Sequence, residues 1–172
     1  MTQRIPLFGL FIAIATILFS VESLIPIPMP WFRIGLANII TLLVLIWWGF
    51  RYASVVLILR ILIGSMLIGK LFQPAFFLSL TGGISSLLAM SLAFRLYPKY
   101  LGLIGVSVMG AVSHNLAQII LTYFIYIRHS NIFSFIPFYI LAAIVTGCFI
   151  GSVVILTHQK LDTRNRPFST SH

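Results

Sequence analysis

The side chains that could do chemistry in this sequence are a few polar groups set inside long apolar runs. The most concentrated set is His114, Asn115 and Gln118, within the stretch 105–118. At about 100° per residue, these three side chains lie on one arc of a helix. An imidazole and two amides donate and accept hydrogen bonds, and leaving them unpaired in hydrocarbon costs several kcal/mol. We therefore expect this arc to face another helix or a ligand.

Arg60 is the most costly polar residue in the chain, because it lies near the middle of an apolar run. Placing a guanidinium at the centre of a membrane helix costs about 2.5–3.5 kcal/mol on insertion scales. Three interpretations of Arg60 stay open. It binds an anion or a carbonyl group in a cavity, it pairs with Glu22, or it donates to main-chain carbonyls. Glu22 is the only acid in the apolar part of the chain, since Asp162 lies in the C-terminal tail.

The connection after the first apolar run supplies further polar groups. Prolines at positions 26, 28 and 30 exclude a helix there, so residues 22–30 form either a stiff linker or a lid over a cavity. Asn38 and Thr41 follow, one helical turn apart, and either bind a ligand or hold two helices together. We predict a binding site for a ligand with an anionic or carbonyl end and an apolar body, formed by Arg60, His114, Asn115, Gln118, Asn38, Arg33 and Glu22.

The sequence lacks the residues and motifs that known classes of enzyme use for catalysis. The chain has two acids in total, 140 positions apart, so no paired carboxylates can hold magnesium on a diphosphate. It has no phosphate-binding loop, no nucleophile elbow and no zinc-type cluster of His and Cys. We therefore expect no catalytic residues, no metal and no cofactor, and a site that binds by hydrogen bonds.

The composition indicates a membrane protein. Of 172 residues, 60% are hydrophobic and 8% are charged, and repeated apolar runs of about twenty residues are typical of membrane helices. The formal net charge of +9 could suggest a nucleic-acid partner, but the basic residues lie at the ends of the apolar runs. The expected partner is therefore a lipid bilayer, and we place the chain in a bacterial-type inner membrane as a multi-pass protein.

The apolar runs predict an all-α bundle of six transmembrane helices in one domain, residues 1–157. The expected spans are about 5–23, 34–50, 52–69, 74–94, 102–127 and 132–157. Residues 158–172 are expected to form a polar, disordered cytoplasmic tail. With the N-terminus inside, seven basic residues lie on inner segments and three on outer loops, which favours both termini in the cytoplasm.

Two stripes of small residues predict close contact between helices. The fourth span carries Gly82 and Gly83 on one face, and the sixth repeats the pattern in Ala143, Gly147 and Gly151. Small residues at this spacing let two membrane helices approach until their backbones touch. We interpret both stripes as packing faces and not as parts of the binding site.

Four motifs resemble a known membrane family. They are Arg33-Ile-Gly-Leu-Ala-Asn-Ile-Ile-Thr-Leu, Arg60-Ile-Leu-Ile-Gly-Ser, Ser79-Leu-Thr-Gly-Gly and Gly105-Val-Ser-Val-Met-Gly-Ala-Val-Ser-His-Asn-Leu-Ala-Gln. The resemblance is to the heptaprenyl diphosphate synthase component I family, also called the Gx transporter family, and covers nearly all of residues 5–157. That family looks like the substrate-binding subunits of energy-coupling factor importers. The resemblance implies a bound small molecule and a coupling membrane protein driven by ATPase subunits.

Three functions follow from these observations. The first is a transport-type subunit that binds a small organic molecule, such as an isoprenoid or quinone precursor or a vitamin. The second is a non-catalytic membrane subunit that assists a soluble polyprenyl diphosphate synthase. The third is a structural helix bundle. A small-molecule pocket is expected for the first, a cytoplasmic docking patch for the second, and complete pairing of the polar groups inside the protein for the third.

Overall fold

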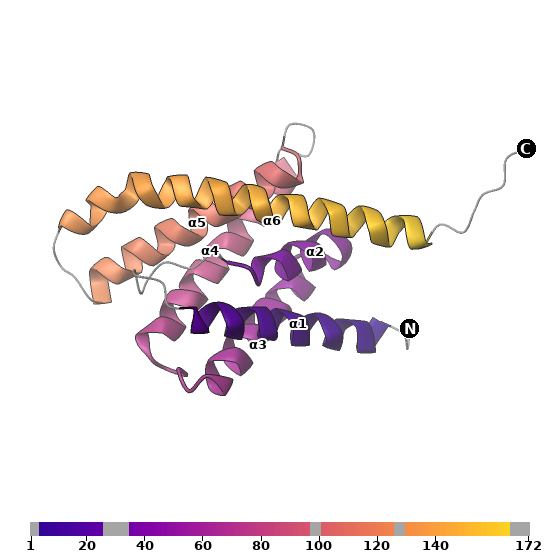
Figure 1. Ribbon diagram of the computed structural model, residues 1–172, viewed down its shortest axis with the longest axis horizontal. Helices are drawn as coiled ribbons and strands as arrows, with labels where there is room; N and C mark the ends of the chain where they lie inside the picture. Colours follow the sequence, from indigo (N-terminus) through magenta and orange to yellow (C-terminus); the bar gives the residue numbers. More distant parts are fainter. Residues whose placement is uncertain (1–3, 26–34, 97–100, 126–129, 166–172) are drawn as a thin grey trace, which may run out of the picture.

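The computed structural model describes residues 4–25, 35–96, 101–125 and 130–165 of the chain. This part of the chain is helical and contains no strand. Its elements are α1 (Arg4–Leu24), α2 (Asn38–Trp48), α3 (Phe50–Leu67), α4 (Pro74–Leu96), α5 (Leu103–Ile125), a short 3₁₀ helix η1 (Ser130–Phe135) and α6 (Ile136–Asn165) (Figure 1). The predicted all-α fold is confirmed.

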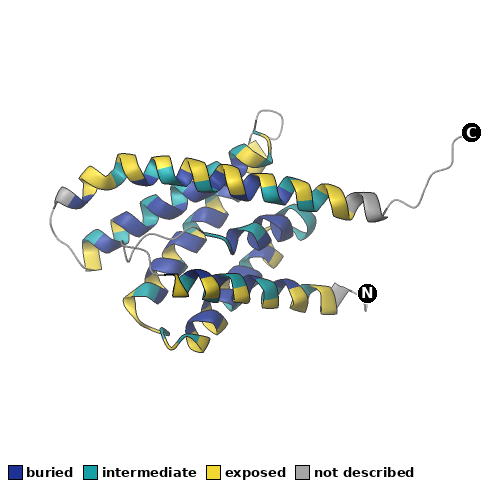
Figure 2. Ribbon diagram, viewed as in Figure 1, coloured by how far each residue is buried: buried dark blue, intermediate teal, exposed yellow. Residues whose placement is uncertain are grey.

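Five of the helices are long and apolar enough to cross a membrane. The candidate spans are Pro6–Leu24, Phe50–Leu67, Pro74–Leu96, Leu103–Ile125 and Ile132–Leu161. Each has at least 18 residues, and about 20 residues at 1.5 Å per residue match the hydrocarbon thickness of a bilayer. Large apolar side chains on their outer faces are exposed, as on α6 at Leu141, Val145 and Phe149 (Figure 2). These features describe a multi-pass membrane bundle.

The second predicted span is wrong in its length. The helix in this region is α2, which has 11 residues and begins at Asn38 instead of residue 34. At 1.5 Å per residue, α2 is about 16 Å long and cannot cross a bilayer core of about 30 Å by itself. The chain enters α2 through a turn, in which the N–H of Asn38 donates to the carbonyl of Gly35 at 2.8 Å.

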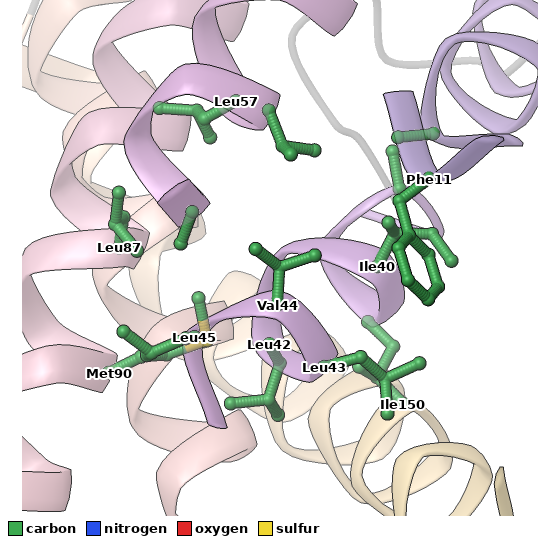
Figure 3. Close-up of a cluster of buried hydrophobic side chains, with 14 of the residues drawn as sticks. Phe11, Ile40, Leu42, Leu43, Val44, Leu45, Leu57, Leu87, Met90 and Ile150 are labelled. Carbon is green, nitrogen blue, oxygen red and sulfur yellow. The ribbon is translucent and has the colours of Figure 1, made fainter. Parts of the chain in front are cut away.

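The apolar character of α2 comes from burial inside the protein. Residues 40–45 of α2 are all buried, on every side of the helix. Figure 3 shows α2 side chains, Val44 among them, between Phe11 of α1, Met90 of α4 and Ile150 of α6. A helix that is apolar all round can be a core helix as well as a membrane span. The sequence pattern could not separate these two cases.

The turn from α2 to α3 is as tight as predicted. Gly49 is the one residue between the two helices, and its φ of +85° lies in the left-handed region. Glycine reaches that region without a steric penalty, because it has no Cβ. The expected spans 34–50 and 52–69 likewise left a single residue between the two helices. The helices form a hairpin, and α2 lies against α3 in the bundle.

The last helix is longer than predicted. It continues past residue 157 to Asn165, so residues 158–165 of the expected tail belong to α6. Its 30 residues correspond to about 45 Å. The C-terminal end of α6 and the N-terminal end of α1 lie at the same end of the bundle (Figure 1). This arrangement of the two helix ends agrees with the predicted placement of both termini on one side of a membrane, and that placement, with its cytoplasmic side, stays a prediction.

Helices α5 and α6 approach each other at two glycines of α6. A Cβ added to Gly147 would lie 2.6 Å from the Cα of Val108, and one added to Gly151 would lie 2.7 Å from the Cα of Ile104. Ala143, one turn before Gly147, is completely buried. The backbone of α5 therefore lies directly on this face of α6.

A leucine at Gly147 should force these two helices apart. We expect Gly147→Leu to lower the free energy of unfolding by about 1–3 kcal/mol, the usual cost of overpacking. Titration with a denaturing detergent in bicelles would measure it. The matched control is Cys148→Leu at the next position, whose side chain is exposed. Equal stability of the two variants would contradict the close approach at Gly147.

Candidate functional site

Arg60 of α3 and Asn38 of α2 form a buried polar pair. The guanidinium Nη2 donates to the Asn38 Oδ1 at 2.7 Å. The side chains of Arg60 and Asn38 are 3% and 5% exposed. Arg60 lies seven residues before the end of α3, about 10 Å along the helix axis, so its charge is well inside the bundle.

Glu22 joins the end of α1 to the start of α2. Its carboxylate accepts hydrogen bonds from the main-chain N–H groups of Gly35 and Leu36, the second at 3.0 Å. Gly35 has a φ of +81°, a conformation that side chains other than glycine adopt rarely. These main-chain donors precede α2 and have no partner within a helix, so the carboxylate takes the place of the helical carbonyls.

Glu22, Asn38 and Arg60 line one cavity, together with residues from α4 and α5. The space that the centre of a water molecule can occupy there is about 20 Å³, room for about one or two waters. The cavity is partly open to the surface. Among the described residues, those that line it are Phe19, Glu22, Gly35, Ala37, Asn38, Arg60, Ile61, Ser79 and His114.

His114 contributes one wall of the cavity, and Gly82 of α4 lies directly behind it. A Cβ added to Gly82 would lie 2.9–3.0 Å from three atoms of the imidazole ring. The His114 side chain is 6% exposed. The imidazole thus fills the space that a side chain at position 82 would occupy. Gly82, which the sequence indicated as a packing residue, therefore also positions His114.

An alanine at Gly82 should move the imidazole and change the cavity. We expect Gly82→Ala to cost about 1–3 kcal/mol of stability, because its methyl group overlaps the ring in a packed interior. Thermal unfolding in nanodiscs would measure it. Gly9→Ala is the matched control, since nothing lies within 4 Å of a Cβ at that helical glycine. The same melting temperature for Gly82→Ala and wild type would contradict the tight contact with His114.

Asn115 and Gln118, the other residues of the predicted arc, do not line the cavity. The Asn115 Nδ2 donates to the carbonyl of Tyr139 at 3.3 Å, and the Gln118 Nε2 donates to the carbonyl of Leu78 at 3.4 Å. Both side chains are buried. They connect α5 to α6 and α4, so the arc divides between one residue that faces the cavity and two that face neighbouring helices.

The structure therefore brings together four of the seven predicted site residues. Glu22, Asn38, Arg60 and His114 line the cavity. Arg33 and the proline segment 26–30 lie outside the described residues. Thr41 is buried and donates to the carbonyl of its own helix at Ala37, at 3.3 Å.

Four side chains of the described lining were not among the predicted site residues: Phe19, Ala37, Ile61 and Ser79. Ser79 belongs to the face of small residues on α4, and we had interpreted that face as packing only. Phe19 gave no signal, because it is one of many apolar residues in α1. Its ring packs where a Cβ of Gly64 would be, in the third span beside Arg60. A glycine one turn from a buried charge is the pattern that could have indicated an aromatic neighbour.

The chemistry of this cavity is hydrogen bonding between charged and neutral polar groups. One guanidinium, one carboxylate, one amide, one hydroxyl and one imidazole surround it. Among the described residues, no three His, Cys, Asp or Glu side chains gather as a metal site requires. Such a set can hold a polar group of a ligand in a fixed orientation.

Comparison with known proteins assigns the chain to a family. No curated protein and no solved structure matches it. The family described as heptaprenyl diphosphate synthase component I matches residues 11–157. That match covers well over half of the 172 residues and includes every side chain that lines the cavity. The chain belongs to the heptaprenyl diphosphate synthase component I family.

Proposed function

We propose that this protein is a transport-type membrane subunit that binds a small organic molecule by its polar end. The observation that carries the proposal is the cavity around Arg60. A buried guanidinium is expensive in a membrane protein, and such residues are typical of substrate pathways and ligand sites. Four further polar side chains on four other helices converge on the same cavity, which is more than the packing of α3 requires.

The size of the cavity indicates how a ligand would bind. A space of about 20 Å³ holds one small polar group and not a whole molecule. The polar end would enter beside Arg60, and Phe19 and Ile61, the apolar side chains of the lining, would contact the start of the apolar body. With both termini in the cytoplasm, as predicted, the cavity lies in the outer half of the bundle. Ligand would then be taken from outside the cell.

The four motifs resemble the component I family, and the likeness of that family to substrate-binding subunits of energy-coupling factor importers supports this function. The Arg60-Ile-Leu-Ile-Gly-Ser motif supplies both the guanidinium and the glycine behind Phe19. In such a scheme a coupling membrane protein and ATPase subunits would drive release of the ligand. Purification from native membranes, followed by native mass spectrometry, would test for these partners.

The family name favours a second candidate function. It describes component I of a heptaprenyl diphosphate synthase, so a synthase is the partner to test. In this alternative the chain is a non-catalytic membrane subunit that a soluble synthase binds. The end of α6 beyond residue 157, with Lys160 exposed, would be available for such a contact.

One experiment separates the two candidates. The protein would be purified from native membranes in mild detergent and analysed intact by native mass spectrometry. A bound small molecule in near-stoichiometric amount supports the transport-type subunit. A complex with a polyprenyl diphosphate synthase and no small molecule supports the alternative. Protein that carries neither would contradict both proposals.

A further inference from the structure

We propose that the Arg60 cavity accepts a neutral polar group, a hydroxyl or an amide, and excludes carboxylates and phosphates. This inference rests on the proposed function and names the class of ligand. It narrows the expectation from the sequence, which named both Arg60 and Glu22 as site residues and allowed an anionic or a carbonyl end. The structure places Glu22 in the lining of the same cavity.

The first argument concerns charge. Among the described residues, the lining contains one cationic side chain, Arg60, and one anionic side chain, Glu22, both at least nine-tenths buried. Their charges balance inside the bundle. A ligand carboxylate or phosphate would add a second negative charge beside Glu22, in surroundings where charges are screened weakly. A ligand ammonium would meet Arg60 in the same way. A neutral group leaves the balance unchanged.

The second argument concerns hydrogen bonds. A guanidinium only donates, and a carboxylate only accepts. A group placed between Arg60 and Glu22 therefore needs an acceptor for one and a donor for the other. A hydroxyl or a primary amide has both, whereas a carboxylate or a phosphate ester has only acceptors when fully ionised. Ser79 and His114 extend this mixed lining on the α4 and α5 side.

The third argument concerns volume. The space of about 20 Å³ fits one or two waters, which is the size of a hydroxyl or a small amide. A phosphate group is larger, and a diphosphate is larger again. Gly82 and Gly64 lie behind His114 and Phe19, and the rings fill the space that these glycines leave. The cavity therefore cannot become wider unless a helix moves.

A set of probes with one chain and different polar ends tests this inference. The probes are octanol, octanamide, octanoate, octylamine and octyl phosphate, each added to protein in phosphatidylcholine nanodiscs. The measurement is the shift of the melting temperature with probe concentration. Because the octyl chain of the probe and the bilayer are the same throughout, differences in the melting-temperature shift report the effect of the polar end. We expect octanol and octanamide to stabilise the wild type, and the three charged probes to bind at least about tenfold more weakly.

Two variants make the test specific. In Glu22→Gln the negative charge is gone, and the side-chain amide oxygen can still accept a hydrogen bond from a main-chain N–H. The affinity for octanoate should then increase at least about tenfold relative to that for octanol. Arg60→Lys keeps the charge balance and should keep the preference for neutral probes. Arg51→Gln is the matched control. Arg51 is exposed on the first turn of α3 and does not line the cavity, so this variant should behave as the wild type.

Three outcomes would overturn the inference. They are wild-type binding of octanoate or octyl phosphate as strong as that of octanol, an unchanged preference in Glu22→Gln, and the absence of a stabilising neutral probe. The native mass spectrum decides the proposed function separately. A co-purifying phosphate or carboxylate ligand would preserve the proposed function and refute the neutral class, whereas protein that binds nothing would refute both.

Discussion

Arg60→Gln is expected to weaken binding of the native ligand about 10- to 150-fold, which corresponds to the roughly 1.5–3 kcal/mol of a hydrogen bond to a charged group. The lost interaction is the one between the guanidinium and the polar end of the ligand in the cavity. Glutamine is shorter than arginine but keeps an N–H₂ group, which can still donate to Asn38. Glu22 also keeps its two main-chain hydrogen bonds, from Gly35 and Leu36, in this variant. We therefore expect folding to change less than binding.

The experiment compares ligand occupancy and stability in the same preparations. Occupancy is read from native mass spectra of protein purified from native membranes, and stability from thermal unfolding in nanodiscs. Arg51→Gln is the control, because it removes an arginine from an exposed position of the same helix. If Arg60→Gln lowers stability and leaves occupancy unchanged, Arg60 holds helices together and does not bind the ligand.

Glu22→Ala is expected to lower the free energy of unfolding by roughly 3–5 kcal/mol, the range for a buried charge that loses its partner. The variant removes the acceptor of two main-chain hydrogen bonds, from Gly35 and Leu36. It also leaves the guanidinium of Arg60 without the carboxylate that balances it in the cavity. Since the cavity is partly open, water can replace part of these interactions, and the lower end of the range is expected.

Denaturing-detergent titration in bicelles would measure this loss. Leu24→Ala is the matched control, because it lies two residues further along α1 and is 71% exposed. Glu22→Gln should fall between wild type and Glu22→Ala, since its amide oxygen can accept one of the two main-chain hydrogen bonds. A loss no larger than that of Leu24→Ala would show that Glu22 does not join α1 to α2.

The sequence by itself determined the class of the protein. Repeated apolar runs of about twenty residues with charges at their ends are typical of membrane helices. The long helices begin and end near the predicted residues, except that α6 continues to Asn165. The polar candidates also came from the sequence, because a charge or an amide in an apolar run is conspicuous. Glu22, Asn38, Arg60 and His114, which line the cavity, were all identified in this way.

The tertiary structure alone decided how these residues are used. Whether an apolar helix faces lipid or protein depends on its neighbours, so α2 was mistaken for a full span. His114 and Asn115 are adjacent in sequence and share an arc, yet one lines the cavity and the other donates to Tyr139. Periodicity gives the direction of a side chain from its own helix, and only the packing of other helices supplies its partner. For Arg60 that packing brought Glu22 to the same cavity, and the two opposite charges there are the basis of the ligand class that we propose.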